Sequence, residues 1–141
     1  MEAFGIVLLW LHLMAIAVAG AAAFGIPVVG AAARRGTADH RPVLMAVAGR
    51  LSMAGRGALV VLLVTGPLLI WAKYGGVPPG PWFSIKMVVV LLLIATVILS
   101  GFNAKWMAAG DKAALTRAPL LAKAGMALLA LTVLFAVLTF R

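Results

Sequence analysis

The chain has 141 residues, of which 65% are hydrophobic and only 11% are charged. A soluble domain carries about 25% charged residues, so this chain has too little polar surface to cover a water-soluble globule. The absence of cysteine excludes disulfides and thiolate metal sites. In a soluble chain, the net charge of +9 would suggest a nucleic-acid partner. Here the basic residues stand in short segments between apolar runs, where they orient a membrane protein and meet anionic lipid. We therefore expect no nucleic-acid partner.

Long apolar runs without strand-like alternation predict an all-α protein, an integral membrane four-helix bundle that forms a single transmembrane domain over residues 1–141. In lipid, helices satisfy every backbone polar group internally, which favours them over irregular structure. The expected helices cover residues 4–32, 43–72, 82–102 and 120–140.

The first expected helix is uncharged from Phe4 to Ala32, which exceeds the roughly 20 residues that cross a membrane. We therefore expect it to be tilted or to extend beyond the bilayer. Pro27 should kink or loosen its far end. Glu2 stands where a signal peptide would have basic residues, so we interpret the segment as a retained helix.

The second expected helix starts near Val43 and carries Arg50 and Arg56 before an apolar stretch, Gly57 to Trp71. Pro67, after Thr65 and Gly66, should bend that stretch. A segment rich in glycine and proline then predicts a reversal of the chain.

The third expected helix runs from Trp82 to Phe102, with Lys86 about one turn from its start. A loop is expected over residues 103–119, and the fourth helix follows it. No walker-type phosphate loop, dinucleotide fingerprint or serine–histidine–aspartate set is present in the sequence.

Counting lysine and arginine in the connecting segments predicts the orientation. The first and third connections with their flanks are rich in basic residues, whereas the second side holds only Lys73 and Lys86. The first and third connections should therefore be cytoplasmic, with both termini outside. Aromatic residues should mark the outer boundary: Trp10, Trp71, Tyr74 and Trp82.

His12 lies inside an uncharged membrane helix, where ionisable residues are rare and usually face the interior of a bundle. Small residues share its face at helical spacing: Gly5, Ala15, Ala19, Gly20 and Ala23. One interpretation is close helix packing, with His12 hydrogen-bonded across the interface. The other is room for a flat macrocycle whose iron His12 binds.

Lys86 should lie in the same outer half of the bilayer as His12. In one interpretation Lys86 extends its amine to the outer interface and needs no partner. In the other it belongs to the site of His12, either as a second axial ligand once deprotonated by burial or as a counter-charge to a carboxylate. Arg50 and Arg56 either mark the cytoplasmic boundary or hold a propionate or another anion. His40 is expected to be a solvated loop residue, and the methionines are expected to fill apolar space.

The chain resembles the HemJ-type protoporphyrinogen oxidases, small four-helix membrane proteins. The resemblance rests on Trp10-Leu11-His12-Leu13, on Gly49-Arg50-Leu51, and on Trp82-Phe83-Ser84-Ile85-Lys86 with the apolar run after it. It implies haem b as the cofactor, His12 as an axial ligand of the iron, Lys86 as a second ligand or essential neighbour, and Arg50 as the family's helix-two arginine. We therefore expect His12 and Lys86 to bind the haem and its iron, and Lys86 and Arg50 to be the catalytic residues. The segment after the helix-three leucines departs from the family because it has no histidine.

From that resemblance we expect a bacterial inner-membrane oxidoreductase that oxidises protoporphyrinogen IX to protoporphyrin IX and passes electrons to an acceptor such as a quinone. Two alternatives remain open: a haem-binding electron carrier without a porphyrin substrate, and a non-enzymatic four-helix transporter or scaffold. The stripes of small residues indicate helix contacts, either within one chain or in a homo-oligomer.

Overall fold

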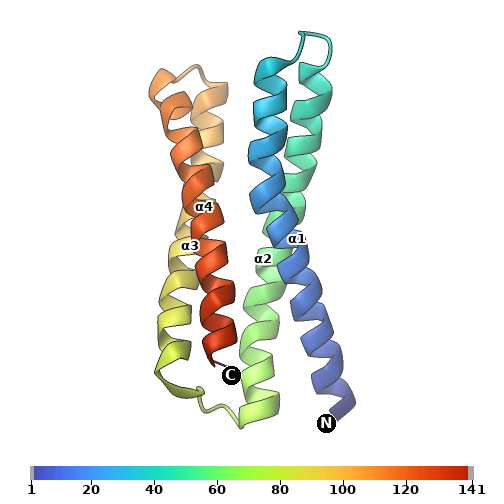
Figure 1. Ribbon diagram of the computed structural model, residues 1–141, viewed down its shortest axis with the longest axis vertical. Helices are drawn as coiled ribbons and strands as arrows, with labels where there is room; N and C mark the ends of the chain where they lie inside the picture. Colours follow the sequence, from blue (N-terminus) through green and yellow to red (C-terminus); the bar gives the residue numbers. More distant parts are fainter. Residues whose placement is uncertain (1, 140–141) are drawn as a thin grey trace. The chain divides into compact units, whose positions relative to one another are not determined.

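The computed structural model describes residues 2–139 and contains four long α-helices (Figure 1). They are α1 (Glu2–Arg35), α2 (Arg41–Tyr74), α3 (Gly80–Ala108) and α4 (Lys112–Thr139). Each is long and apolar enough to cross a membrane, which confirms the prediction of an all-α, multi-pass membrane protein with four candidate spans. Phe140, the expected last residue of the fourth helix, lies outside the described residues.

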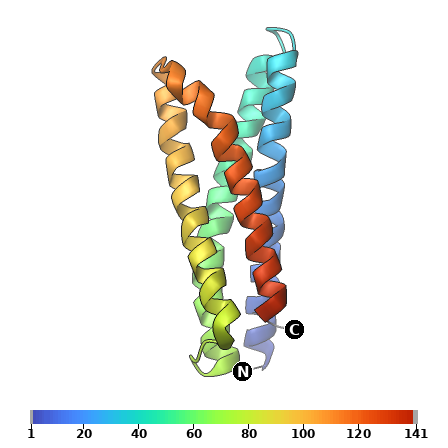
Figure 2. The same ribbon diagram turned by 60° about the vertical axis from the view of Figure 1, so that its left-hand side comes forward.

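The chain divides into two compact units, residues 1–79 with α1 and α2, and residues 80–141 with α3 and α4. In each unit the two helices run antiparallel and side by side (Figures 1 and 2). The single four-helix domain over residues 1–141 stays a prediction.

Small residues form the contact between α1 and α2. Buried positions on α1 recur every seven residues at Leu8, Ala15 and Ala22, the spacing of a helix face in continuous contact with a neighbour. A Cβ added to Gly55 of α2 would lie only 2.7 Å from the Ala22 Cβ. The two backbones therefore approach as closely as membrane helices do at small residues.

The helices extend further than the expected ranges, most clearly in the second unit. The expected loop over residues 103–119 is wrong: α3 continues to Ala108 and α4 begins at Lys112. Gly110 has a φ of 90° and ends α3, because the Asp111 N–H reaches back to the Trp106 carbonyl oxygen. The Asp111 carboxylate then accepts the Ala113 N–H and caps α4.

The internal prolines do not interrupt the helices. Pro27 lies within α1 and Pro67 within α2, and helical structure continues on both sides of each. The end of α2 is instead set by Gly75, whose φ of 62° lets its N–H bond the Ile70 carbonyl oxygen. The glycine-rich and proline-rich segment expected to reverse the chain is thus where α2 ends.

Candidate functional site

His12 and Thr65 connect α1 to α2. The Nδ1 atom of His12 lies 2.7 Å from the Oγ1 atom of Thr65, which is only 4% exposed. The same hydroxyl lies 2.7 Å from the carbonyl oxygen of Val61, one turn earlier in α2. The structure thus shows the hydrogen bond across the helix interface that one interpretation of His12 expected, and it identifies the partner.

The two contacts of Thr65 determine where the proton of His12 resides. A threonine hydroxyl has one proton and two lone pairs, whereas the Val61 carbonyl oxygen can only accept. The hydroxyl therefore donates to Val61, and its Oγ1 accepts a proton from His12 Nδ1. In this tautomer Nε2 carries the lone pair, so Nε2 is the nitrogen that can bind a metal.

The local sequence of α2 supports this geometry. Threonine inside a helix commonly bonds the carbonyl oxygen four residues earlier, which leaves its oxygen as an acceptor for a neighbouring helix. The next residue is Gly66, where an added Cβ would lie 3.8 Å from His12 Cε1. The imidazole therefore lies against a residue that has no side chain.

Among residues 2–139, no group of three or more histidine, cysteine, aspartate or glutamate side chains could hold a metal ion. A metal bound through His12 would therefore need most of its ligands from elsewhere. Haem iron fits this donor set, because the porphyrin supplies four nitrogens and the protein needs only one or two axial ligands. The hydrogen bond from Nδ1 is the kind of second contact that orients a ligating histidine.

Lys86 belongs to α3, in the second unit, and is half-buried. Because α3 begins at Gly80, Lys86 lies about 9 Å along the helix, or nearly two turns rather than the expected one. Its assignment as a metal ligand, a cofactor contact and a catalytic residue stays a prediction.

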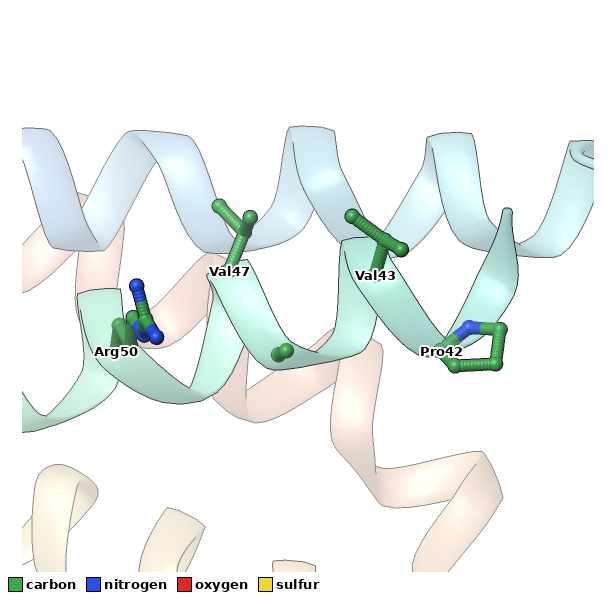
Figure 3. Close-up of a pocket in the computed structure, with 5 residues that line it drawn as sticks. Pro42, Val43, Val47 and Arg50 are labelled. Carbon is green, nitrogen blue, oxygen red and sulfur yellow. The ribbon is translucent and has the colours of Figure 1, made fainter. Parts of the chain in front are cut away.

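Arg50 is exposed on α2, beside a hollow lined by residues of that helix alone (Figure 3). It precedes Thr65 by 15 residues, which corresponds to about 22 Å along a helix. The site built around His12 therefore does not include Arg50, and the catalytic role of Arg50 stays a prediction. Arg56 is exposed as well.

Further polar contacts lie in the first connecting segment and near the ends of α3 and α4. His40 is exposed, and its Nδ1 lies 2.7 Å from Thr37 Oγ1, in agreement with a solvated loop residue. In the second unit Asn103 is 3% exposed and donates from Nδ2 to the Ala114 carbonyl oxygen at 2.8 Å. Asn103 was expected in a loop, and instead it joins α3 to α4.

Thr65 and Asn103 are the polar residues that sequence reasoning missed. In the structure Thr65 follows buried Ala58 by seven residues, so both lie on one face of α2. The sequence alone does not give the register between α1 and α2 that makes Thr65 the partner of His12. Asn103 stands in a segment that resembles a polar loop, so no signal in the sequence indicated its role either.

No family model, curated protein or solved structure matches this chain. The similarity to the HemJ-type proteins therefore remains a prediction that rests on the residues quoted for it. The chain is a four-helix protein with four candidate membrane spans.

Proposed function

We propose that this protein is a bacterial inner-membrane b-haem protein in which His12 is an axial ligand of the iron, and that it oxidises protoporphyrinogen IX to protoporphyrin IX. The observation that carries the proposal is the hydrogen bond from His12 Nδ1 to Thr65, which fixes the tautomer with a lone pair on Nε2. The resemblance to the HemJ-type family supplies the substrate.

In the proposed protein, His12 would hold the haem iron through Nε2. Thr65 keeps the proton on Nδ1 and fixes the plane of the imidazole. The apolar helices keep water away. Lys86 acts as a second ligand or as a neighbour that tunes the site, and Arg50 is a further residue required for activity. When bound, haem supplies electron transfer, and a quinone is a suitable acceptor.

The haem part of the proposal is tested by spectroscopy on the purified protein. We expect a Soret band and a positive pyridine haemochrome assay, and we expect His12→Ala to lose both. His40→Ala is the matched control, because it removes the other histidine, which is exposed and lies in the segment between α1 and α2. Unchanged haem content in His12→Ala would refute ligation by His12.

The enzymatic part is tested separately by complementation of a bacterial strain that lacks protoporphyrinogen oxidase. Growth without added haem is expected with the wild-type chain and not with His12→Ala. If the purified protein binds haem but fails to complement, the electron carrier without a porphyrin substrate replaces the enzyme. If it binds no haem, both are excluded.

A further inference from the structure

Two arginines lie well inside helix α2. Arg50 and Arg56 follow the first residue of the helix, Arg41, by 9 and 15 residues, or about 13 and 22 Å along its axis. A Cβ added to Gly25 would meet Leu51, the neighbour of Arg50, and one added to Gly55, the neighbour of Arg56, would meet Ala22. Both arginines therefore lie beside residues 21–27 of α1, which carry no charge. These cations are therefore not part of the loop between the helices.

The described part of the chain provides no acidic partner for these cations. Within residues 2–139 the ion pair formed is that of Asp111 with Arg117, in the other unit. The acidic residues of the first unit are Glu2, the first residue of α1, and Asp39, in the loop between α1 and α2. A cation without a counter-ion is costly in lipid, so the counter-ions of Arg50 and Arg56 come from outside residues 2–139.

The position of α2 in a bilayer identifies the source. Trp71 suits the membrane–water interface, near the end of the apolar stretch. Arg56 lies 15 residues from Trp71, about 22 Å away, and Arg50 lies 21 residues away, about 31 Å. A hydrocarbon core of about 30 Å therefore ends close to Arg50 and encloses the backbone of Arg56.

Both side chains can reach the same layer. Helical side chains lean toward the N-terminus of their helix, which for α2 is the end nearest residues 36–40. Long arginine side chains extend further in that direction along apolar surface. The guanidinium of Arg56 is thereby brought toward the level of the phosphates, where that of Arg50 already lies.

We propose that Arg50 and Arg56 bind the phosphates of anionic phospholipids in the leaflet next to residues 36–40. Six residues turn an α-helix by about 240°, so the two arginines lie on different faces and each holds its own lipid. Arg50 lines an open hollow together with Pro42, Val43, Ala46 and Val47, and its lipid would lie there (Figure 3). A guanidinium can bind a phosphate through two parallel hydrogen bonds.

The test uses the full chain in a neutral detergent, titrated with phosphatidylglycerol, phosphatidylcholine or inorganic phosphate. Thermal stability and the number of lipids retained in native mass spectrometry are measured. Phosphatidylglycerol should raise the unfolding temperature of the wild type, and the other two should not. Arg50→Gln and Arg56→Gln should each lose a retained lipid and weaken the apparent affinity about fivefold.

Arg35→Gln is the matched control, since it removes the same charge at the last residue of α1. It should retain the lipids bound to the wild type. Equal losses in Arg35→Gln would overturn the proposal in favour of a diffuse charge effect, as would equal stabilisation by phosphatidylcholine or by inorganic phosphate. Arg50→Lys and Arg56→Lys keep the charge, and the same lipid titration is made with them if a glutamine variant does not fold. They should lose less affinity than the fivefold expected for glutamine, and wild-type lipid retention in both would overturn bidentate binding.

Discussion

A single hydroxyl group determines the chemistry available to His12. Thr65 donates to its own helix and accepts from the neighbouring one, so it uses its proton and one lone pair at once. The result is an imidazole with a defined tautomer at a defined rotation. An isolated membrane histidine would have neither, because lipid offers no partner to select between its two nitrogens.

Replacement of Thr65 tests this role directly. Thr65→Val keeps the shape and removes the hydroxyl, so we expect haem affinity to fall about ten- to hundredfold, the usual effect of losing a second contact of a ligand. Thr65→Ser retains the hydroxyl and should stay close to the wild type. The rate of haem transfer to apomyoglobin provides the measurement. Equal rates in both variants would show that the hydroxyl does not orient His12.

The difference between His12 and Thr65 shows how far residues can be assigned from the sequence. His12 was apparent because an ionisable group inside an apolar run is unusual by itself. Thr65 is not unusual, since threonine satisfies its own hydroxyl within a helix. Its role depends on the register between α1 and α2, which is a property of the pair and not of either segment.

At the scale of helices, the contact between α1 and α2 depends on the absence of side-chain atoms. Gly55 lies against Ala22, and an added Cβ would approach the Ala22 Cβ to 2.7 Å, well inside van der Waals contact. A β-carbon cannot rotate away, so only separation of the helices would relieve the overlap. Dispersion contacts between close backbones stabilise such pairs in lipid, where no hydrophobic driving force remains.

Gly55→Ala should therefore destabilise the protein by about 1–3 kcal/mol, the usual cost of overpacking. Gly57→Ala is the matched control on the same helix, because nothing lies within 4 Å of an added Cβ there. That variant should be neutral or slightly more stable, since alanine favours the helix by about 1 kcal/mol. Unfolding by denaturant in detergent micelles measures both. Equal stability of the two variants would contradict the close contact.

The existence of four helices was predictable and some of their ends were not. The length of an apolar run is enough to predict a membrane helix, and each of the four runs forms a helix long and apolar enough to cross a membrane. The third connection was overestimated because its polar residues resemble a loop, whereas Asn103 and Asp111 make the hydrogen bonds that allow both helices to continue. Polar composition does not distinguish a helix that extends into the headgroup layer from an unstructured connection.

For the molecule as a whole, the distribution of basic residues predicts which ends of the helices face the cytoplasm. The chain has no cysteine, so single cysteines can be introduced without a background reaction. Ala38, Val77 and Ala109 are exposed and lie in the three connections. A membrane-impermeant maleimide applied from outside should label only Val77→Cys, and should label Ala38→Cys and Ala109→Cys after the membrane is opened. Labelling of Ala38→Cys from outside would reverse the topology.

In both units the close contacts join helices that follow one another along the chain, with connections of only a few residues. This arrangement has a consequence for synthesis. Once α2 has left the ribosome, every residue that the α1–α2 contact requires is already present, and the hairpin can close while α3 is still being made. Little chain has to be ordered before those contacts form, which favours rapid folding. A chain that ends after Gly80 and is released from the ribosome should therefore already pair His12 with Thr65.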